Sequence, residues 1–330
     1  MQPTLFAVVR ELFEASNALY SFKESFMAAF KMKNIFIITS IVVLTQSVFG
    51  GAWVQKKGGH FFKLSIHFMN TNYEFDHEGN RLKILKERLI FDDVYFRDVS
   101  FSIYSEYGLS DIVTLVGYLP FKSYTSKRTI NTIYQTTDEQ ITTSGFGDLL
   151  LSGRLAIFQK SFALSFQSGI KIPMGYSDQP DNDGPRLGTG DIDFEGQILM
   201  GVSLYPLPVY ITGGFGYRHR LGELHDELLS HVELGFATGR FLFKTYVEWI
   251  KNTNQPPDIY GQPVVTPLPG GGGVLPETIV GDQDILKLSP SIIYYFNQNM
   301  GVQLEISAIL AGKNTVSGTT FSLALILTYL

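Results

Sequence analysis

The chain has 330 residues, of which 45% are hydrophobic, 14% aromatic and 17% charged, and its mean hydropathy is +0.09. A chain this apolar is not disordered, and a net charge of −5 without a basic block gives no reason to expect nucleic acid as a partner. The absence of cysteine excludes disulfides, thiolate metal sites and cysteine nucleophiles.

The first strongly apolar stretch, KMKNIFIITSIVVLTQSVFGGAW, has the pattern of a secretory signal peptide. Two lysines precede the apolar run Ile35–Leu44, and small residues follow it. We expect cleavage after Gly50 or Ala52. An uncleaved membrane anchor is the alternative, but the run is short for a membrane span. Because the signal pattern begins at Met32, we expect translation to start there.

Beyond this stretch, apolar and polar side chains alternate along most of the chain, as in strands with one apolar face. In the first such segment Phe62, Leu64, Ile66 and Phe68 alternate with Lys63, Ser65 and His67. The pattern predicts twelve strands, near residues 60–75, 93–107, 111–122, 146–158, 161–174, 190–205, 208–220, 228–238, 240–252, 284–296, 299–311 and 317–330.

The lengths of the strands and of their connections distinguish a soluble sandwich from a transmembrane barrel. A soluble sandwich would bury its apolar faces, but these strands run to about 12–16 residues, where globular strands have about 5–6. Tight turns alternate with longer connections over 76–92, 123–145, 175–189, 221–227 and 253–283, the last one around GKNTVSG excepted. Short turns at one end and longer loops at the other are typical of a transmembrane barrel.

The sequence therefore predicts an all-β fold, a transmembrane antiparallel up-and-down β-barrel of about twelve strands with short periplasmic turns and longer extracellular loops. The predicted parts are an upstream extension over 1–31, a signal peptide over 32–52 and an outer-membrane β-barrel over 53–330.

The last strand is similar to the insertion signal of outer-membrane barrels. It places Phe321, Leu323, Leu325, Leu327 and Tyr329 on one face, although Leu330 stands where that signal usually has phenylalanine. This resemblance implies a Gram-negative outer membrane as the location and the barrel-assembly machinery as a partner during biogenesis.

A series of local motifs resembles one family of outer-membrane proteins. GHFFKLS is followed in order by YSEYGLSDIVTLVGYLPF, SGFGDLLLSGRLAIF, ALSFQSGIKIPMGYSD and LGTGDIDFEGQILMGVSLYPLPVYITGGFGYRHR. Over residues 52–330 they resemble the transporters named after the meta-pathway of phenol degradation, which are similar to fatty-acid-type channels. The resemblance implies passive uptake or efflux of small compounds, hydrophobic or aromatic ones among them, with outer-membrane lipid and a small solute as partners. It implies no cofactor.

The polar faces of the predicted strands collect charges that would line the lumen. Two interpretations stay open, a selectivity lining and a structural salt-bridge network, since mixed charges in a narrow interior must pair or stay hydrated. The selectivity candidates are Glu106, Arg154, Lys171, Asp193, Glu195, Glu233, Lys244, Glu248, Lys287 and Glu305. The same faces also carry Asp98.

The stretch DIDFE places Asp191, Asp193 and Glu195 on one face, about 7 Å apart. Three carboxylates could bind a cation. We favour instead a polar barrel face paired with Arg154 or Lys171, and predict no metal site.

The six histidines show no HExxH or other close ligand spacing. They stand at positions 60, 67, 77, 219, 225 and 231. A barrel enzyme of lipase or protease type is the alternative function, and it would need a histidine paired with a serine or aspartate at the outer rim. We predict no enzymatic activity and no catalytic residue. A structural barrel with a plugged lumen is the third possibility.

Three further expectations concern the rim and the loops. Aromatic side chains near strand ends predict membrane-interface anchors: Tyr205, Tyr217, Trp249, Tyr294 and Tyr329. FDHEGNRLK (75–83) has too few ligands for a calcium loop and predicts a hairpin tip. RLKILKERL (81–89) has near-helical spacing and predicts a short helix or a segment that folds inward as a partial plug.

Overall fold

The barrel strands of this chain close into a ring, so that each has a hydrogen-bonded neighbour on both sides. In lipid, the unpaired N–H and C=O groups of an open sheet edge would be costly. A computed structural model describes residues 51–84, 91–131, 134–176, 184–222, 224–254 and 282–329, all within one compact unit over 45–330. The predicted extension and all but the last two residues of the predicted signal peptide lie outside the described residues.

The described residues form sixteen strands, with no helix long and apolar enough to cross a membrane. The strands are β1 (His60–Thr71), β2 (Tyr73–Phe75), β3 (Arg81–Lys83), β4 (Phe91–Ser110), β5 (Val113–Asn131), β6 (Thr136–Phe146), β7 (Asp148–Gln159), β8 (Phe162–Pro173), β9 (Asp193–Ser203), β10 (Val209–Arg220), β11 (Glu227–Thr238), β12 (Phe241–Asn252), β13 (Asp284–Tyr295), β14 (Met300–Lys313), β15 (Thr315–Val316) and β16 (Thr319–Tyr329).

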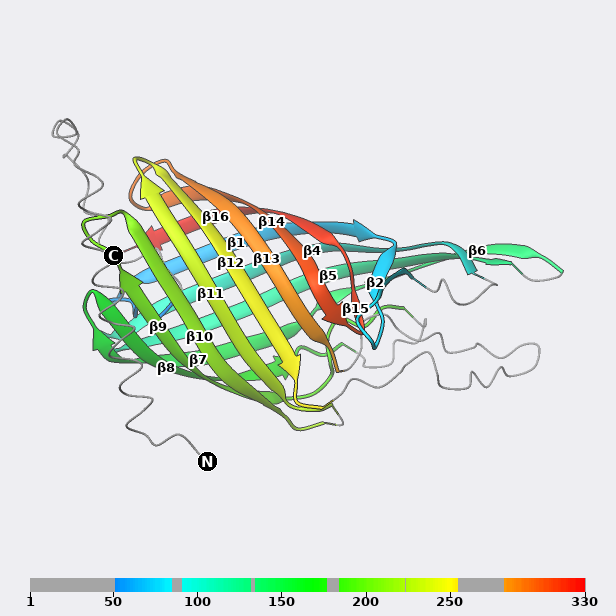
Figure 1. Cartoon of the computed structure of the whole chain (residues 1–330), viewed down its shortest axis with the longest axis horizontal. Helices are drawn as coiled ribbons and strands as arrows, with labels where there is room; N and C mark the ends of the chain where they lie inside the picture. The colour runs from blue at the N-terminus through cyan, green and yellow to red at the C-terminus, as the bar shows by residue number, and fades with distance from the viewer. Residues whose placement is uncertain are drawn as a thin grey trace, which may run out of the picture. The chain divides into compact units, whose positions relative to one another are not determined.

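Twelve of these strands make the barrel, as the sequence predicts. Each pairs antiparallel with its neighbours, β1 lies between β4 and β16, and the β4–β5 pairing closes the ring. Tight turns connect β4 to β5, β7 to β8, β9 to β10, β11 to β12 and β13 to β14 at one end, which we call the turn end (Figure 1). The opposite end is the loop end.

The two faces of the wall differ in chemistry as the alternation requires. On β10, Ile211 and Phe215 point outward and are 39% and 57% exposed, whereas Thr212 points inward and is 2% exposed. Strand β9 follows the same pattern: Ile198, which pairs with Phe215, is exposed, and Asp193 is fully buried. An apolar outer face around a polar interior is the arrangement of a membrane barrel.

One predicted loop is wrong. Most of residues 123–145 do not form a loop but continue β5 and add β6, which pairs with β5 from Phe121↔Phe146 to Asn131↔Thr136. This hairpin projects beyond the barrel at the loop end (Figure 1). Its threonine-rich composition carries no strong apolar alternation, because neither face is covered by lipid or core.

A small second sheet lies at the loop end. It consists of β15, β2 and β3. Arg81–Lys83 are therefore a strand, and the predicted helix is wrong for these residues. The chain then folds inward at Ile84, which packs with Met69, Phe96 and Val316. Residues 85–90 lie outside the described part. At the tip, Asp76 Oδ1 accepts the N–H groups of Glu78, Gly79 and Asn80, which is the predicted hairpin turn.

Candidate functional site

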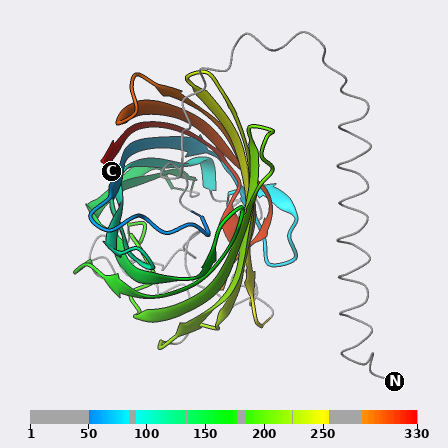
Figure 2. The same ribbon diagram turned by 90° about the vertical axis from the view of Figure 1, so that its left-hand side faces the viewer.

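The residues before β1 cross the interior of the barrel. Figure 2, which views the turn end, shows this stretch in blue running across the opening. We call residues 51–59 the N-terminal segment. Ala52 is fully buried against Ala163 and Leu199 of the wall. The segment therefore occupies the lumen at the turn end.

Wall side chains hold this segment through its backbone. The Ala52 carbonyl accepts hydrogen bonds from Ser165 Oγ and, at 2.9 Å, from Gln159 Nε2. The Gln55 N–H donates to Thr114 Oγ1 at 2.7 Å, and Gln55 Nε2 donates to Glu106 at 2.6 Å. A peptide without regular structure must find such partners when it is buried, because an unsatisfied backbone group is costly.

The segment joins the wall at Gly108 of β4. Gly58 N–H donates to the Gly108 carbonyl at 2.8 Å, and Gly108 N–H donates to the Gly59 carbonyl at 2.9 Å. A Cβ at position 108 would lie 1.8 Å from the Lys56 carbonyl oxygen. Glycine is therefore required here by the close approach of two backbones.

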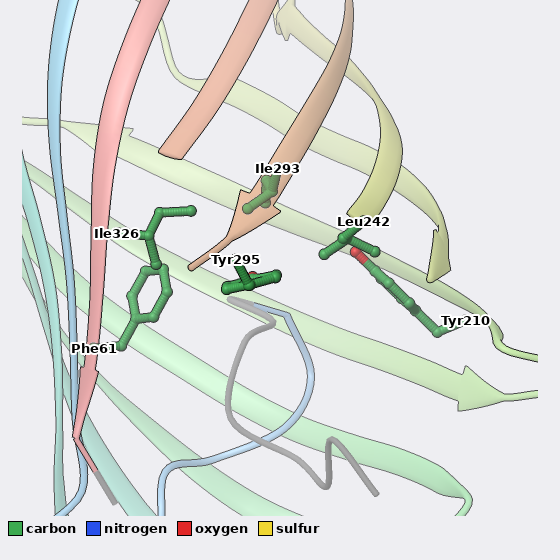
Figure 3. Close-up of a cluster of buried hydrophobic side chains, with 6 residues drawn as sticks. All are labelled: Phe61, Tyr210, Leu242, Ile293, Tyr295 and Ile326. Atoms are coloured by element: carbon green, nitrogen blue, oxygen red, sulfur yellow. The ribbon is translucent and has the colours of Figure 1, made fainter. Parts of the chain in front are cut away.

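An apolar cluster lies on the inner face near the segment. Six buried side chains from five strands form it: Phe61, Tyr210, Leu242, Ile293, Tyr295 and Ile326 (Figure 3). Trp53 of the segment packs against this cluster. The interior at the turn end thus has an apolar floor, which lies beside the charged groups that contact the segment.

Above this floor, charges of opposite sign are paired. Arg154 contacts Glu106 at 3.1 Å and also donates to the Trp53 carbonyl at 3.0 Å. Tyr104 donates to Glu106 at 2.6 Å. The Arg154–Glu106 pair therefore anchors the N-terminal segment as well as neutralising two buried charges.

A second set of pairs lies on the inner face of β11, β12 and β13. Glu233 accepts from Lys244 and from the Tyr210 hydroxyl, both at 2.6 Å. Lys287 and Glu248 are 2.5 Å apart on adjacent strands. Such contacts satisfy charges that the interior could not otherwise hold.

The structure places all ten predicted lumen residues on the inner face of the wall. Besides the residues above, Lys171 contacts Asp193, and Glu195 contacts Arg218 at 2.5 Å. Glu305 accepts from Gln303 at 2.9 Å. None of this tests whether they select a solute, so that role stays a prediction. Asp98 also points inward, with Ser100 as its hydrogen-bond donor.

The carboxylates of DIDFE separate in the structure. Asp193 pairs with Lys171, one of the two expected partners, whereas Arg154 pairs with Glu106 instead. Glu195 forms a salt bridge with Arg218, and Asp191 lies before the start of β9. Asp193 and Glu195 thus pair with two different cations.

A cavity of about 220 Å³ lies in the lumen toward the loop end. We call it the vestibule. Its walls come from β5, β7, β8 and β10–β13 and from residues 186–189 of the connection before β9: Lys122, Tyr124, Asp148, Lys171, Arg186, Leu187, Gly188, Thr189, Arg218, Arg220, Glu227, Ile250, Gln283 and Ile285. The vestibule thus reaches across the lumen.

Two histidine–aspartate pairs occupy the rim at the loop end. His219 lies 3.1 Å from Asp226, and His225 Nδ1 lies 2.6 Å from Asp282. Burial alone would raise the pKa of Asp226, but hydrogen bonds from the Tyr217 hydroxyl, the Arg220 N–H and His219 lower it to about 2. Burial opposes ionisation of Asp282 too, yet its hydrogen bonds from His225 and Asn252 lower its pKa.

Neither pair extends to a nucleophile among the described residues. The other ring nitrogen of His225 lies 2.9 Å from Asn254 Nδ2, not from a hydroxyl. Inside the lumen, His67 contacts the hydroxyls of Ser322 and Ser102 but no carboxylate. A catalytic triad requires acid, base and nucleophile in one chain of contacts. The rim thus supplies the histidine–aspartate pair that the barrel-enzyme alternative requires, but no nucleophile in contact with it among the described residues, and the absence of enzymatic activity stays a prediction.

The five predicted anchor aromatics belong to the outer surface near strand ends. Tyr205 and Tyr329 are 80% and 66% exposed at the turn end, and Trp249 and Tyr217 are 50% and 44% exposed toward the loop end. Tyr294 packs against Phe241 and Phe296 on the outside. Their contact with the membrane interface stays a prediction.

Several charged residues of the interior were missed at the level of sequence. Arg218 and Arg220 alternate with Tyr217 and His219, so extending the β10 pattern to its end would have found them. Lys122 follows from the same rule on β5. The N-terminal segment had no such signal, because its sequence has no period and lies next to the predicted signal peptide.

Comparison with known proteins supports the fold. No protein-family model and no curated protein matches the sequence, so membership of the phenol meta-pathway family stays a prediction. Among solved structures, the chain is similar to the COG4313 outer membrane channel from Pseudomonas putida F1, with a TM-score of 0.59 and 13% identity over 86% of this chain and 100% of that one. At this identity the likeness bears on the fold alone.

Two weaker matches are also membrane proteins by name. The toluene transporter TbuX from Ralstonia pickettii gives a TM-score of 0.42 and 7% identity over 84% of this chain and 90% of that chain. The KdgM porin gives 0.41 and 5% over 81% and 99%. Neither score is high enough to carry an argument.

The contacts of Ala52 bear on the predicted cleavage. Cleavage after Ala52 would remove the carbonyl that Ser165 and Gln159 bind and leave the fully buried Ser165 without that acceptor. We therefore propose cleavage after Gly50. The intact mass of the mature protein from an outer-membrane fraction should correspond to a chain beginning at Gly51, and a chain beginning at Trp53 would contradict this.

The close approach at Gly108 gives a second test. Gly108→Ala should displace the N-terminal segment and destabilise the protein by about 1–3 kcal/mol, the usual cost of overpacking. The emission of Trp53, measured in a Trp249→Phe background, should shift to longer wavelength.

Gly153→Ala is the matched control, since a Cβ there meets nothing within 4 Å. It should leave both stability and emission unchanged. An unshifted Trp53 spectrum in the folded Gly108→Ala protein would show that the segment is not held as described.

Proposed function

We propose that the protein is an outer-membrane channel for passive uptake or efflux of small compounds, hydrophobic and aromatic ones among them. Outer-membrane lipid and a small solute are its partners, and no cofactor or catalytic step is involved. The observation that carries the proposal is the combination of an apolar outer wall with a charged interior that contains a cavity of about 220 Å³. A barrel that served only as a wall would need no such space.

The wall of the barrel supports an outer-membrane location. In lipid, a β-sheet can leave no edge unpaired, and this barrel closes through β4–β5. Its outer face carries many half-exposed large apolar side chains, such as Phe215, Leu234 and Phe321. Such a surface is unfavourable in water and favourable in a bilayer.

The interior supports a solute with apolar parts. Along the lumen, the charged vestibule precedes an apolar floor that includes Phe61 and Tyr295. An aromatic solute could exchange water for contact with these side chains at the floor. The N-terminal segment stands in its way, so passage requires the segment to shift or leave a gap.

One observation favours a structural barrel as the second candidate. The N-terminal segment and the paired charges fill much of the lumen, and paired charges suit a plug as well as a selectivity lining. The channel and the structural barrel differ in whether a solute passes through the lumen.

The test is a measurement of passage in reconstituted membranes. Planar bilayers containing the purified protein should show a protein-dependent KCl current that phenol reduces as it enters the lumen, and liposomes should take up a radiolabelled aromatic solute faster with the protein than without it.

Protein that has been heat-unfolded, recognised by its changed gel migration, is the control and should give neither signal. Folded protein that gives neither current nor uptake would contradict the channel and favour the structural barrel.

A further inference from the structure

The vestibule has an uneven distribution of charge. Five cationic side chains form part of its lining, but only two carboxylates do, those of Asp148 and Glu227. Asp193 and Glu195, which pair with Lys171 and Arg218, do not line the cavity and are 0% and 6% exposed. The lining of the vestibule thus has more cationic side chains than carboxylates. Such a lining favours an anionic solute.

Arg220 has donors that the wall does not use. Its Nη2 contacts Glu227, whereas Nε and Nη1 make no hydrogen bond, although its side chain is 4% exposed. The nearest carboxylates to these two nitrogens are at 3.9 and 4.0 Å, beyond hydrogen-bond reach. A buried guanidinium normally has its donors satisfied. Within the wall these two nitrogens have only the longer contacts to Asp193 and Asp282, so Arg220, which lines the vestibule, has capacity for a further acceptor.

Lys122 is the second incompletely used cation. Its ammonium donates to the Leu187 carbonyl at 2.6 Å and lies 5.5 Å from the Tyr124 ring centre. No ion pair joins it to a carboxylate among the described residues. An ammonium has three donors, so Lys122 has capacity for an anionic acceptor in the vestibule.

The remaining lining fits an apolar body of limited size. Leu187, Ile250 and Ile285 line the vestibule together with Tyr124. A space of 220 Å³ corresponds to roughly seven water molecules at about 30 Å³ each. That is room for a single ring with one small substituent.

We propose that the vestibule binds the carboxylate of a small amphipathic monocarboxylate, held by Lys122 and Arg220 with its apolar body against the aliphatic wall. This deepens the proposed channel function, on which it rests, by naming the class of solute. A carboxylate accepts several hydrogen bonds at once and so matches the donors of both cations.

The test compares an acid with its neutral analogue. Titration calorimetry of the full-length folded protein in detergent should show benzoate binding at least about tenfold more tightly than benzyl alcohol, which has the same ring but no charge. Lys122→Gln should weaken benzoate binding about tenfold, the loss expected for one charge-assisted hydrogen bond. Benzyl alcohol binding should not change.

Two matched variants keep the result specific. Lys127→Gln removes the same charge from the projecting part of β5, where Lys127 pairs with Asp93, and should leave benzoate binding unchanged. Lys122→Arg should restore most of the affinity. Lys122 was chosen because it forms no salt bridge among the described residues, although its charge acts on Asp98 and Asp148; heat-modifiable gel migration should show that the variant folds.

Three results would overturn the inference. Equal affinity for benzoate and benzyl alcohol would show that the site does not prefer an anion. Inorganic phosphate binding as tightly as benzoate would show that the apolar ring does not contribute to binding. Unchanged benzoate binding in Lys122→Gln would place the site elsewhere. Any of these in a protein that conducts in planar bilayers contradicts this inference alone, whereas a protein without current or uptake contradicts the channel.

Discussion

The structure depends on one constraint, that a backbone in lipid must pair every N–H and C=O group. Twelve strands satisfy it only by closing, and the β4–β5 pairing completes the ring. Closure then sorts the side chains, because alternate residues of each strand must face either lipid or lumen. The apolar outer surface and the polar interior are consequences of this one requirement.

Closure creates a second problem inside. A twelve-stranded barrel has a narrow interior, and charges placed there must be paired or hydrated. Near the turn end the wall pairs charges with one another and with the N-terminal segment, as Arg154 does with Glu106 and the Trp53 carbonyl. Toward the loop end the pairing is incomplete: Lys122 and Arg220 line the vestibule, Lys122 forms no salt bridge among the described residues, and two Arg220 nitrogens lack a hydrogen-bond acceptor.

The wall could be predicted from the sequence because each strand carries its own period-two signal. Asp193 and Phe194 alternate in the chain and so face opposite sides. Partner choice could not be predicted in the same way, since Glu195 pairs with Arg218 across a strand register that only the folded sheet defines.

The β6 extension was missed because its faces are both solvated and lack an apolar alternation. The N-terminal segment was the part least accessible to sequence reasoning, because it has no period and its partners, such as Thr114 and Ser165, lie more than fifty residues away in the chain. Even Gly108 gave no clear signal, since a glycine within a strand can equally mark a bulge or a bend.

Wall side chains hold the N-terminal segment inside the lumen at the turn end, so the segment should restrict passage there. The most direct test is the single-channel conductance of the folded barrel with residues 51–57 deleted, compared with the complete protein in the same bilayer. We expect a conductance several-fold higher in the deleted form. Equal conductance in a deleted protein that still shows heat-modifiable gel migration would contradict it.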